Sequence, residues 1–465
     1  MTEGSSQPPP LSKHADGTAL SWAPFLTAPV EPIPGCIKQR DEEFLVEELP
    51  RYEPCGEGEH IYLFVEKRGL STSGLIRVVS DHFKVNHRDI GYAGMKDKNA
   101  ITRQVISVHM PGRRPEDFPM LQHDRVGVLW ADLHTNKLRR GHLLGNRFSV
   151  WIRETDARRV ADAHRILQFL SARGMPNFYG HQRFGTRRRN HELGRLYLQR
   201  EFEALLDLLL GPDPNMPNLN RVAREAYARG DYAGAREAMP AAQRTEIAAL
   251  RALEKGRNPA DAVQAVAQMQ RVFWVTAWQS AIFNRVLARR LSEHAESEDP
   301  GSALTMLRPG DIAFKHDNHA MFRVDDATAA DPETPERIKR REISPTGPMF
   351  GIRTMLCDGK SAEVEREEFE KEGVPMEALE RVVKTLGESV AGTRRPLRTL
   401  VTDPEVEGGV DENGHFIRCA FDLPAGSFAT MLVRELLKSD RIECRQSLSF
   451  DPSAEAIDET EDTDG

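Results

Sequence analysis

The order of strand-like and helix-like stretches is the feature of this chain that most restricts its fold. Strand texture dominates from about residue 35 to residue 200, as in the β-branched and aromatic run His60–Glu66. From about residue 201 to residue 290 the sequence becomes helical and rich in alanine, and a mixed stretch follows. Strand texture then returns at His415–Leu423. Because 465 residues exceed one ordinary domain, we expect a sheet-based domain that is interrupted by an inserted domain.

The same changes of texture predict the domain boundaries. Both ends of the chain lack apolar periodicity and are expected to be disordered. The last fifteen residues contain seven acidic residues, so the formal net charge of −8 falls to −1 for the rest of the chain. We expect, in order, a disordered arm at 1–27, the first part of the sheet-based domain at 28–200, the insertion at 201–390, the second part at 391–447, and an acidic tail at 448–465.

Several protein classes are disfavoured by what the sequence lacks. It has no run of eighteen apolar residues that would predict a membrane span, and its first residues lack the apolar core of a secretion signal. The five cysteines are widely spaced, so we expect neither a zinc site nor a disulfide framework. These features predict a cytoplasmic protein.

A single carboxylate stands out in the glycine-marked stretch 91–104. Asp97 lies between Lys96 and Lys98, two glycines precede it, and a strand-like run follows. Glycine allows a sharp turn or a close approach to a ligand, and nearby cations favour the charged form of a carboxylate. Asp97 is therefore a candidate nucleophile or base. The local pattern fits a solvated surface loop with alternating charges equally well.

Two further glycine-marked segments carry groups suited to recognition of a nucleobase. Asn177 has an amide that can donate to and accept from a base edge, and aromatic residues follow it. Phe428 begins a predicted helix shortly after Gly426, and Phe44 lies near the start of a predicted strand. Recognition of an unpaired base combines aromatic stacking with hydrogen bonds to its exposed edge.

A cluster of arginines follows the second of these segments. A basic patch on a nearly neutral body can bind a phosphate backbone. An arginine-rich helix face that forms surface ion pairs would also give such a cluster, and without other evidence it is the simpler explanation. The candidate phosphate contacts are Arg183, Arg187, Arg188 and Arg189.

Three motifs in this order resemble those of the TruD family of pseudouridine synthases. They are Gly91–Gln104, Asn177–Gly185 and Leu423–Lys438. Weaker similarities lie at Phe44–Glu48, Gly56–His60 and Gln279–Asn284, so the match runs in order across about residues 35–440. The Phe178-Tyr179 pair reverses the commoner order of the two aromatics, and the helical segment 201–257 is longer than in compact bacterial members. The resemblance therefore covers nearly the whole chain apart from its two ends.

The resemblance implies both a fold and a reaction. The fold class is α+β, with a catalytic core on a mixed, mainly antiparallel sheet with flanking helices, interrupted by an inserted α+β TRUD domain. TruD-like enzymes isomerise uridine to pseudouridine in RNA, and bacterial members act on position 13 of tRNA. By position in the motifs, the catalytic aspartate is Asp97 and its lysine is Lys38. The uridine-contacting residues are Phe44, Asn177 and Phe428.

This isomerisation predicts a simple set of requirements. The reaction changes no oxidation state overall and transfers no external group, so we expect no cofactor and no metal; one nucleophile suffices. We expect Lys38 to hold the charge of Asp97, with Lys96 and Lys98 as local alternatives. The expected partner is tRNA, with no membrane and no obligatory protein partner. Two alternatives are a catalytically silent RNA-binding factor on the same scaffold and a hydrolase, which would need a second carboxylate or a metal cluster.

Overall fold

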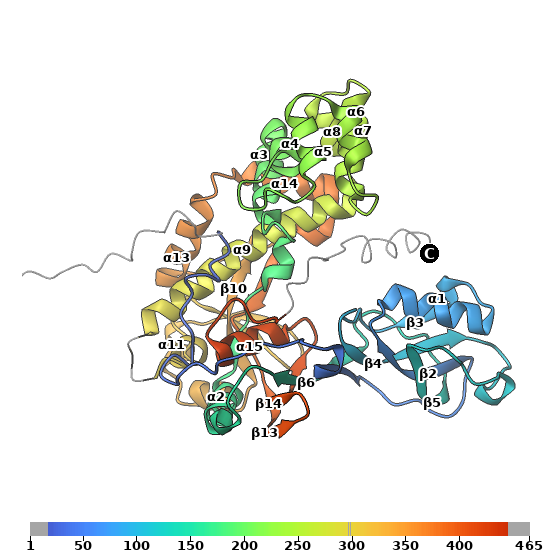
Figure 1. Ribbon diagram of the computed structural model, residues 1–465. Coiled ribbons are helices and arrows are strands. Elements are labelled where there is room, and N and C mark those ends of the chain that lie inside the picture. Colours follow the sequence, from blue (N-terminus) through green and yellow to red (C-terminus); the bar gives the residue numbers. More distant parts are fainter. Residues whose placement is uncertain (1–16, 296, 298, 445–465) are drawn as a thin grey trace, which may run out of the picture. The chain divides into compact units, whose positions relative to one another are not determined.

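The chain forms two compact units in a computed structural model that describes residues 17–295, 297 and 299–444. The sheet unit contains Phe25–Asn177, Lys339–Arg341 and the described residues from Arg398 onward. The helical unit contains Phe178–Ile338, Glu342–Leu397 and the described residues before Phe25. The chain thus leaves the sheet unit after residue 177 and returns at residue 398, whereas the sequence predicted changes near residues 200 and 390. Figure 1 labels the elements of both units.

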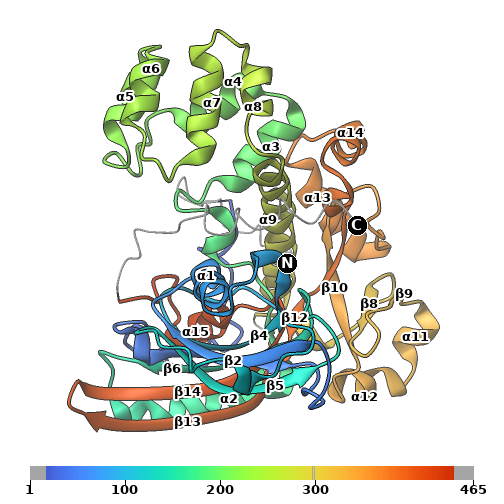
Figure 2. The same cartoon turned by 90° about the vertical axis from the view of Figure 1, so that its right-hand side faces the viewer.

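An eight-stranded sheet forms the framework of the sheet unit. Seven strands follow the order β13-β14-β6-β1-β4-β2-β5, and β3 also pairs with β4. The β1–β4 pair is parallel and the other pairs are antiparallel, so the predicted mixed, mainly antiparallel sheet is confirmed. The β13–β14 hairpin lies beside β6 (Figure 2). The strands are β1 Phe44–Pro50, β2 His60–Arg68, β3 Ile90–Tyr92, β4 Ile101–His109, β5 Val126–His134, β6 Leu143–Ile152, β13 Thr402–Asp411 and β14 Gly414–Pro424.

Helix α1 (Thr72–Phe83) covers one face of this sheet. Ser71 caps the helix, because its Oγ accepts a hydrogen bond of 3.1 Å from the amide of Gly74. Apolar residues at helical spacing, including Leu75 and Val79, pack against the buried faces of β2 and β4. Their spacing in the sequence predicts a helix over this stretch, and the structure confirms it.

Two more helices complete the sheet unit. α2 (Val160–Arg173) packs on β13 and β14, and it also contacts α15 (Ala429–Leu437). α2 ends at Gly174, where φ is +85° and a Cβ atom would lie 2.9 Å from the side chain of Arg398. The tight turn leads into β7 (Met175–Pro176), which pairs with β12 (Arg398–Thr399). This pairing joins the two places where the chain leaves and re-enters the sheet unit.

The described part of the N-terminal segment is packed against the protein. The predicted disordered arm extends to residue 27, but the amides of Leu26 and Thr27 donate to the carboxylate of Glu435 at 3.1 and 3.0 Å. In the helical unit, the Thr18 carbonyl accepts a hydrogen bond from Asn284. Scattered apolar residues, which lack the period of a helix or strand, provide this packing. Residues 1–16 and the predicted tail 448–465 lie outside the described residues.

One disulfide corrects the expectation drawn from the cysteine spacing. Cys36 and Cys444, 408 residues apart in sequence, are joined by a bond between their sulfur atoms. Spacing rules detect cysteines that are close in sequence, so they gave no signal for a pair at opposite ends of the chain. The bond ties the start of the sheet unit to the segment that follows α15.

The helical unit is built around the 27-residue helix α9. The helical spacing of Trp274 and Trp278 in the sequence predicts that they pack in a core, and both are buried along α9. The sequence predicts one helix over Ala262–Arg290, but residues 265–267 interrupt it, between α8 and α9. The helices are α3 Asn190–Gln199, α4 Phe202–Leu210, α5 Arg221–Ala228, α6 Tyr232–Ala238, α7 Arg244–Glu254, α8 Pro259–Gln264, α9 Gln268–His294, α10 Ser302–Thr305, α11 Asp326–Ala330, α12 Glu333–Lys339, α13 Gly359–Glu370 and α14 Met376–Leu386.

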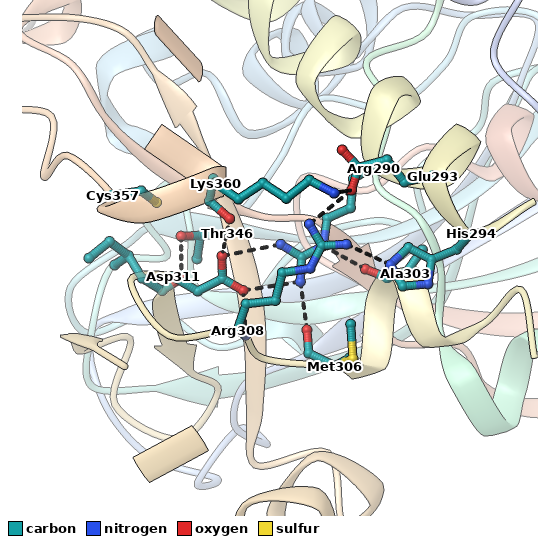
Figure 3. Close-up of polar contacts among 12 residues, drawn as sticks. Arg290, Glu293, His294, Ala303, Met306, Arg308, Asp311, Thr346, Cys357 and Lys360 are labelled. Atoms are coloured by element: carbon teal, nitrogen blue, oxygen red, sulfur yellow. Dashed lines mark hydrogen bonds and ion pairs between the residues drawn. The ribbon is translucent and has the colours of Figure 1, made fainter. Parts of the chain in front are cut away.

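A four-stranded antiparallel sheet, in the order β11-β10-β8-β9, gives the helical unit its α+β character. A buried ion pair joins this sheet to α9: Arg290 lies 3.1 Å from Asp311, and Ser361 also donates to Asp311 (Figure 3). Burial acts to raise the pKa of Asp311, but Arg290 and the hydrogen bonds hold it below its ordinary value. The strands are β8 Ile312–Lys315, β9 Met321–Arg323, β10 Ile343–Met349 and β11 Thr393–Pro396.

The length and apolar character of a helix decide whether it could cross a membrane. None of the helices formed by the described residues combines the length and the apolar character needed to cross a bilayer.

Candidate active site

Asp97 lies in the loop between β3 and β4, and 47% of its side chain is exposed. Two hydrogen bonds hold the backbone of this loop, one at Asp97 and one at Lys96. The main-chain carbonyl of Asp97 accepts a hydrogen bond of 2.9 Å from Lys67 Nζ. The amide of Lys96 donates to Thr72 Oγ1, at the start of α1, over 2.9 Å. A fixed backbone with an exposed carboxylate is suited to nucleophilic attack on a bound substrate.

Lys96 does not supply the cation that faces this carboxylate. Its ammonium lies 2.9 Å from Glu48 Oε2 and donates to Asn146 Oδ1 at 2.5 Å. The side chains of Lys96 and Glu48 are almost fully buried, so this ion pair fixes the loop to β1 and to the start of β6. The alternative in which Lys96 accompanies Asp97 is thus not the arrangement that the structure shows.

Lys38 lies beside Asp97, as the family resemblance implied. Its Nζ is 3.8 Å from Asp97 Oδ2, and 12% of its side chain is exposed. Lys38 has a φ of +58°, a left-handed conformation that is uncommon outside glycine. The turn brings the lysine from the segment before the short helix Asp41–Glu43 to the Asp97 loop, across a sequence distance that no local pattern reveals.

Lys67 is a third functional candidate, which the sequence interpretation missed. It lies in β2 with no exposed surface, and its Nζ donates to the carbonyls of Leu70 and Asp97. Burial lowers the pKa of Lys67 to about 8, although the charge of Asp97 acts in the opposite direction. The available signal was a lysine that follows the apolar part of β2, but an exposed end of the strand would explain the same pattern.

Phe44 is buried beside these charged groups. It is the first residue of β1, it is 2% exposed, and its ring meets that of Phe148 edge-on. Lys38 Nζ lies 4.5 Å from the ring centroid, within the range of a cation–π contact. The structure therefore brings Lys38, Phe44 and Asp97 together, because the ammonium of Lys38 contacts the Phe44 ring and lies close to the Asp97 carboxylate.

Phe428 and Asn177 are placed by neighbouring elements of the same unit. Phe428 is the half-buried N-cap residue of α15 and follows the end of β14 by four residues. In β14, Leu423 pairs with Asn146 of β6. Asn146 is also the residue that accepts a hydrogen bond from Lys96 of the Asp97 loop. Asn177 follows β7 directly and is 7% exposed. Their contact with a substrate base remains a prediction.

The four candidate arginines of the helical unit differ in their surroundings. Arg187 is largely buried, with Nε 2.8 Å from Asp213 and Nη1 donating to the carbonyl of Leu208. Arg183 donates to Ser280 and packs over aromatic rings. Arg188 is exposed and Arg189 is the N-cap residue of α3. Internal contacts thus occupy Arg187, and Arg188 is the most accessible of the four.

A metal could be held only by residues with suitable donor atoms. Within the described ranges, the one grouping of three such residues comprises Cys36, Glu154 and Cys444. The disulfide uses both sulfur atoms, so these residues do not fit a metal ion.

Comparisons with known proteins agree with this fold. The sequence profile of the family tRNA pseudouridine synthase D (TruD) matches residues 23–436. The tRNA pseudouridine synthase D of Geobacter metallireducens is 38% identical over 419 residues, covering 90% of this chain and 98% of that protein. The protein of the same name from Syntrophotalea carbinolica is also 38% identical, over 90% of this chain and all of its own length.

A solved structure gives the same result. A crystal structure from Methanosarcina mazei, assigned to tRNA pseudouridine synthase D (TruD), superposes with a TM-score of 0.75 at 26% identity. The match covers 90% of this chain and 96% of the other. The α+β fold thus has the architecture of a pseudouridine synthase. Within that class, the chain belongs to the TruD family.

Proposed function

We propose that this chain isomerises uridine to pseudouridine in tRNA, with Asp97 as the nucleophile. The observation that carries the proposal is the exposed carboxylate of Asp97 on a fixed loop, 3.8 Å from the ammonium of Lys38. Family membership supports the reaction, because the curated relatives are named tRNA pseudouridine synthases. The family resemblance further suggests the uridine at position 13 as the target.

The reaction exchanges one bond to the ribose for another. The bond between C1′ and N1 of the uracil breaks, the base turns, and a bond between C1′ and C5 forms. C5 then loses its proton while N1 gains one, so no redox partner is needed. Asp97 takes part either by attacking C1′ or by assisting formation of a glycal. Lys38 balances the negative charge of the Asp97 carboxylate before it reacts.

The remaining candidates hold the base and the RNA. A uridine inside a helix must leave the stack before Asp97 can reach its sugar. Phe428, half-buried at the start of α15, would stack on the base, and Asn177 would bond to its edge. Phe44 would hold the ammonium of Lys38 in place through its ring. Arg188 offers an exposed contact for a phosphate.

Replacement of the nucleophile tests the proposal. Asp97→Asn keeps the shape of the side chain but removes its charge, and we expect it to abolish release of tritium from tRNA labelled at C5 of uridine. Asp81→Asn makes the same chemical change at an exposed site on α1 and should retain wild-type turnover. Base-resolution mapping of pseudouridine would identify the modified position.

The outcomes also separate the other functions. Turnover by Asp97→Asn would refute the role of the aspartate. Wild-type protein that binds tRNA but forms no pseudouridine would indicate the silent RNA-binding alternative. Cleavage of the RNA or loss of a base would indicate a hydrolase.

A further inference from the structure

We infer that Glu443 is a positioning residue for Lys38, held in place by a C-terminal strap made of residues 439–444. The inference rests on the proposed function, because it concerns the lysine beside Asp97. The family profile ends at residue 436, so the strap lies beyond the part of the chain that the profile matches. Glu443 is therefore assigned from its contacts alone.

Glu443 makes the shorter of the two contacts between Lys38 and a carboxylate. Lys38 Nζ donates to Glu443 Oε1 at 3.0 Å, whereas it lies 3.8 Å from Asp97 Oδ2, beyond hydrogen-bond distance. Glu443 is 23% exposed and Lys38 is 12% exposed, so solvent screens this ion pair less than a surface pair. Lys38 is thus anchored to Glu443 and offers its charge to Asp97 from a short distance.

This division of contacts suits a nucleophile. A direct hydrogen bond from an ammonium would occupy a lone pair of Asp97 that must attack the sugar. Glu443 takes that hydrogen bond instead, and the carboxylate of Asp97 stays exposed while it keeps a nearby positive charge. Lys38 also lies over Phe44, and the ring and Glu443 together define where its ammonium rests.

Three consecutive residues of the strap, 442–444, contact the segment that carries Lys38. The amide of Ile37 donates to the carbonyl of Ile442 at 2.7 Å, and the amide of Cys444 donates to the carbonyl of Ile37 at 2.9 Å. The disulfide between Cys36 and Cys444 adds a covalent link. These ties flank Glu443 and hold it in parallel register with Ile37, next to Lys38. Such multiple anchoring is what a precisely placed side chain requires.

A charge-removing variant tests this role. Glu443→Gln should lower the single-turnover rate of pseudouridine formation about tenfold or more, because small displacements of catalytic groups are costly. Its affinity for tRNA should remain that of the wild type. Glu443→Asp keeps the carboxylate and should recover most of the rate. Glu154→Gln is the matched control: its carboxylate lies within 4.8 Å of the same disulfide sulfurs but is exposed and should be dispensable.

A double-mutant cycle distinguishes positioning from a general structural effect. In a Lys38→Met background, Glu443→Gln should change the rate by less than about twofold, because its target is already absent. An equal loss in both backgrounds would overturn the inference, as would a wild-type rate for Glu443→Gln. If Glu443→Gln does not fold, the smaller deficit of Glu443→Asp is compared in the same two backgrounds. Wild-type protein without turnover would overturn the proposed function as well, whereas an inactive Asp97→Asn beside a fully active Glu443→Gln would overturn this inference alone.

Discussion

The ammonium of Lys67 donates a hydrogen bond of 2.9 Å to the main-chain carbonyl of Asp97, from a position without exposed surface. A second hydrogen bond of 2.6 Å, to the carbonyl of Leu70, connects the end of β2 to the turn before α1. Lys67 thus holds the backbone of the Asp97 loop, whereas Lys38 lies beside the carboxylate of Asp97. Removing Lys67 would leave two carbonyls without this donor.

Lys67→Met is therefore expected to slow the reaction without weakening RNA binding. Methionine fills a similar volume but cannot donate to the Asp97 backbone, so the loop loses a fixed point. We expect the single-turnover rate to fall about tenfold, since a shift of about 1 Å in a reacting group has an effect of this order or larger. Lys84→Met, at an exposed position after α1, should leave the rate unchanged. An unaltered rate in Lys67→Met would show that the loop is held by its other contacts.

The titration of Lys67 predicts a dependence of stability on pH. Its pKa is about 8 in the folded protein and 10.5 in the unfolded chain, so the unfolded state binds more protons between these values. The free energy of unfolding should therefore rise as the pH increases from about 8 to 10.5, and this contribution is lost as the pH falls through 8. Its upper limit is about 3 kcal/mol. Urea unfolding of the wild type and Lys67→Met at pH 8 and pH 10 measures this contribution, because all other titrating groups are common to the two proteins. If the difference between their free energies of unfolding is the same at both pH values, the prediction is wrong.

The two phenylalanines that the family resemblance assigns to the base should contribute differently to the stability of the protein. Phe44 is 2% exposed and packs against Phe148, so Phe44→Ala should lower the free energy of unfolding by about 3–5 kcal/mol. Phe428 is half-buried, and Phe428→Ala should cost only about 1 kcal/mol while raising KM for tRNA. Chemical denaturation and steady-state kinetics measure the two effects. A large loss of stability in Phe428→Ala would make it a core residue instead of a stacking platform.

The sequence predicted the framework of the site better than its fine geometry. The β2 run and the periodicity of α1 follow from local preference, and both elements form as expected. The contacts around Asp97 could not be predicted from local preference. Lys67 reaches the Asp97 backbone, and Glu443 reaches Lys38, only through the tertiary fold. Glu443 lies 405 residues from Lys38 in the chain. Local patterns carry no information on such pairs, and the family resemblance suggested Lys38 but gave no signal for Glu443.

The arginine cluster shows the same limit. Charge density alone gave Arg187 and Arg188 equal standing, but the fold buries the first against Asp213 and exposes the second. Arg188→Gln should make the salt dependence of tRNA binding shallower by about one unit of slope. Arg187→Ala should instead lower the free energy of unfolding by about 3–5 kcal/mol, because the carboxylate of Asp213 stays buried without its partner. Filter binding at several salt concentrations and urea unfolding measure the two effects; a shallower slope for Arg187→Ala would return it to the RNA footprint.

The disulfide should stabilise the protein by linking segments that are 408 residues apart. Closing so long a loop restricts the unfolded chain, and we expect Cys444→Ser to lower the free energy of unfolding by about 2–5 kcal/mol. Cys55→Ser removes an exposed free thiol from the same unit and is the matched control. Peptide mapping without reductant should recover the pair Cys36–Cys444, and added reductant should lower the stability of the wild type to that of Cys444→Ser. Equal stability of the wild type and Cys444→Ser under oxidising conditions would show that the hydrogen bonds of Ile37 hold the strap without the covalent link.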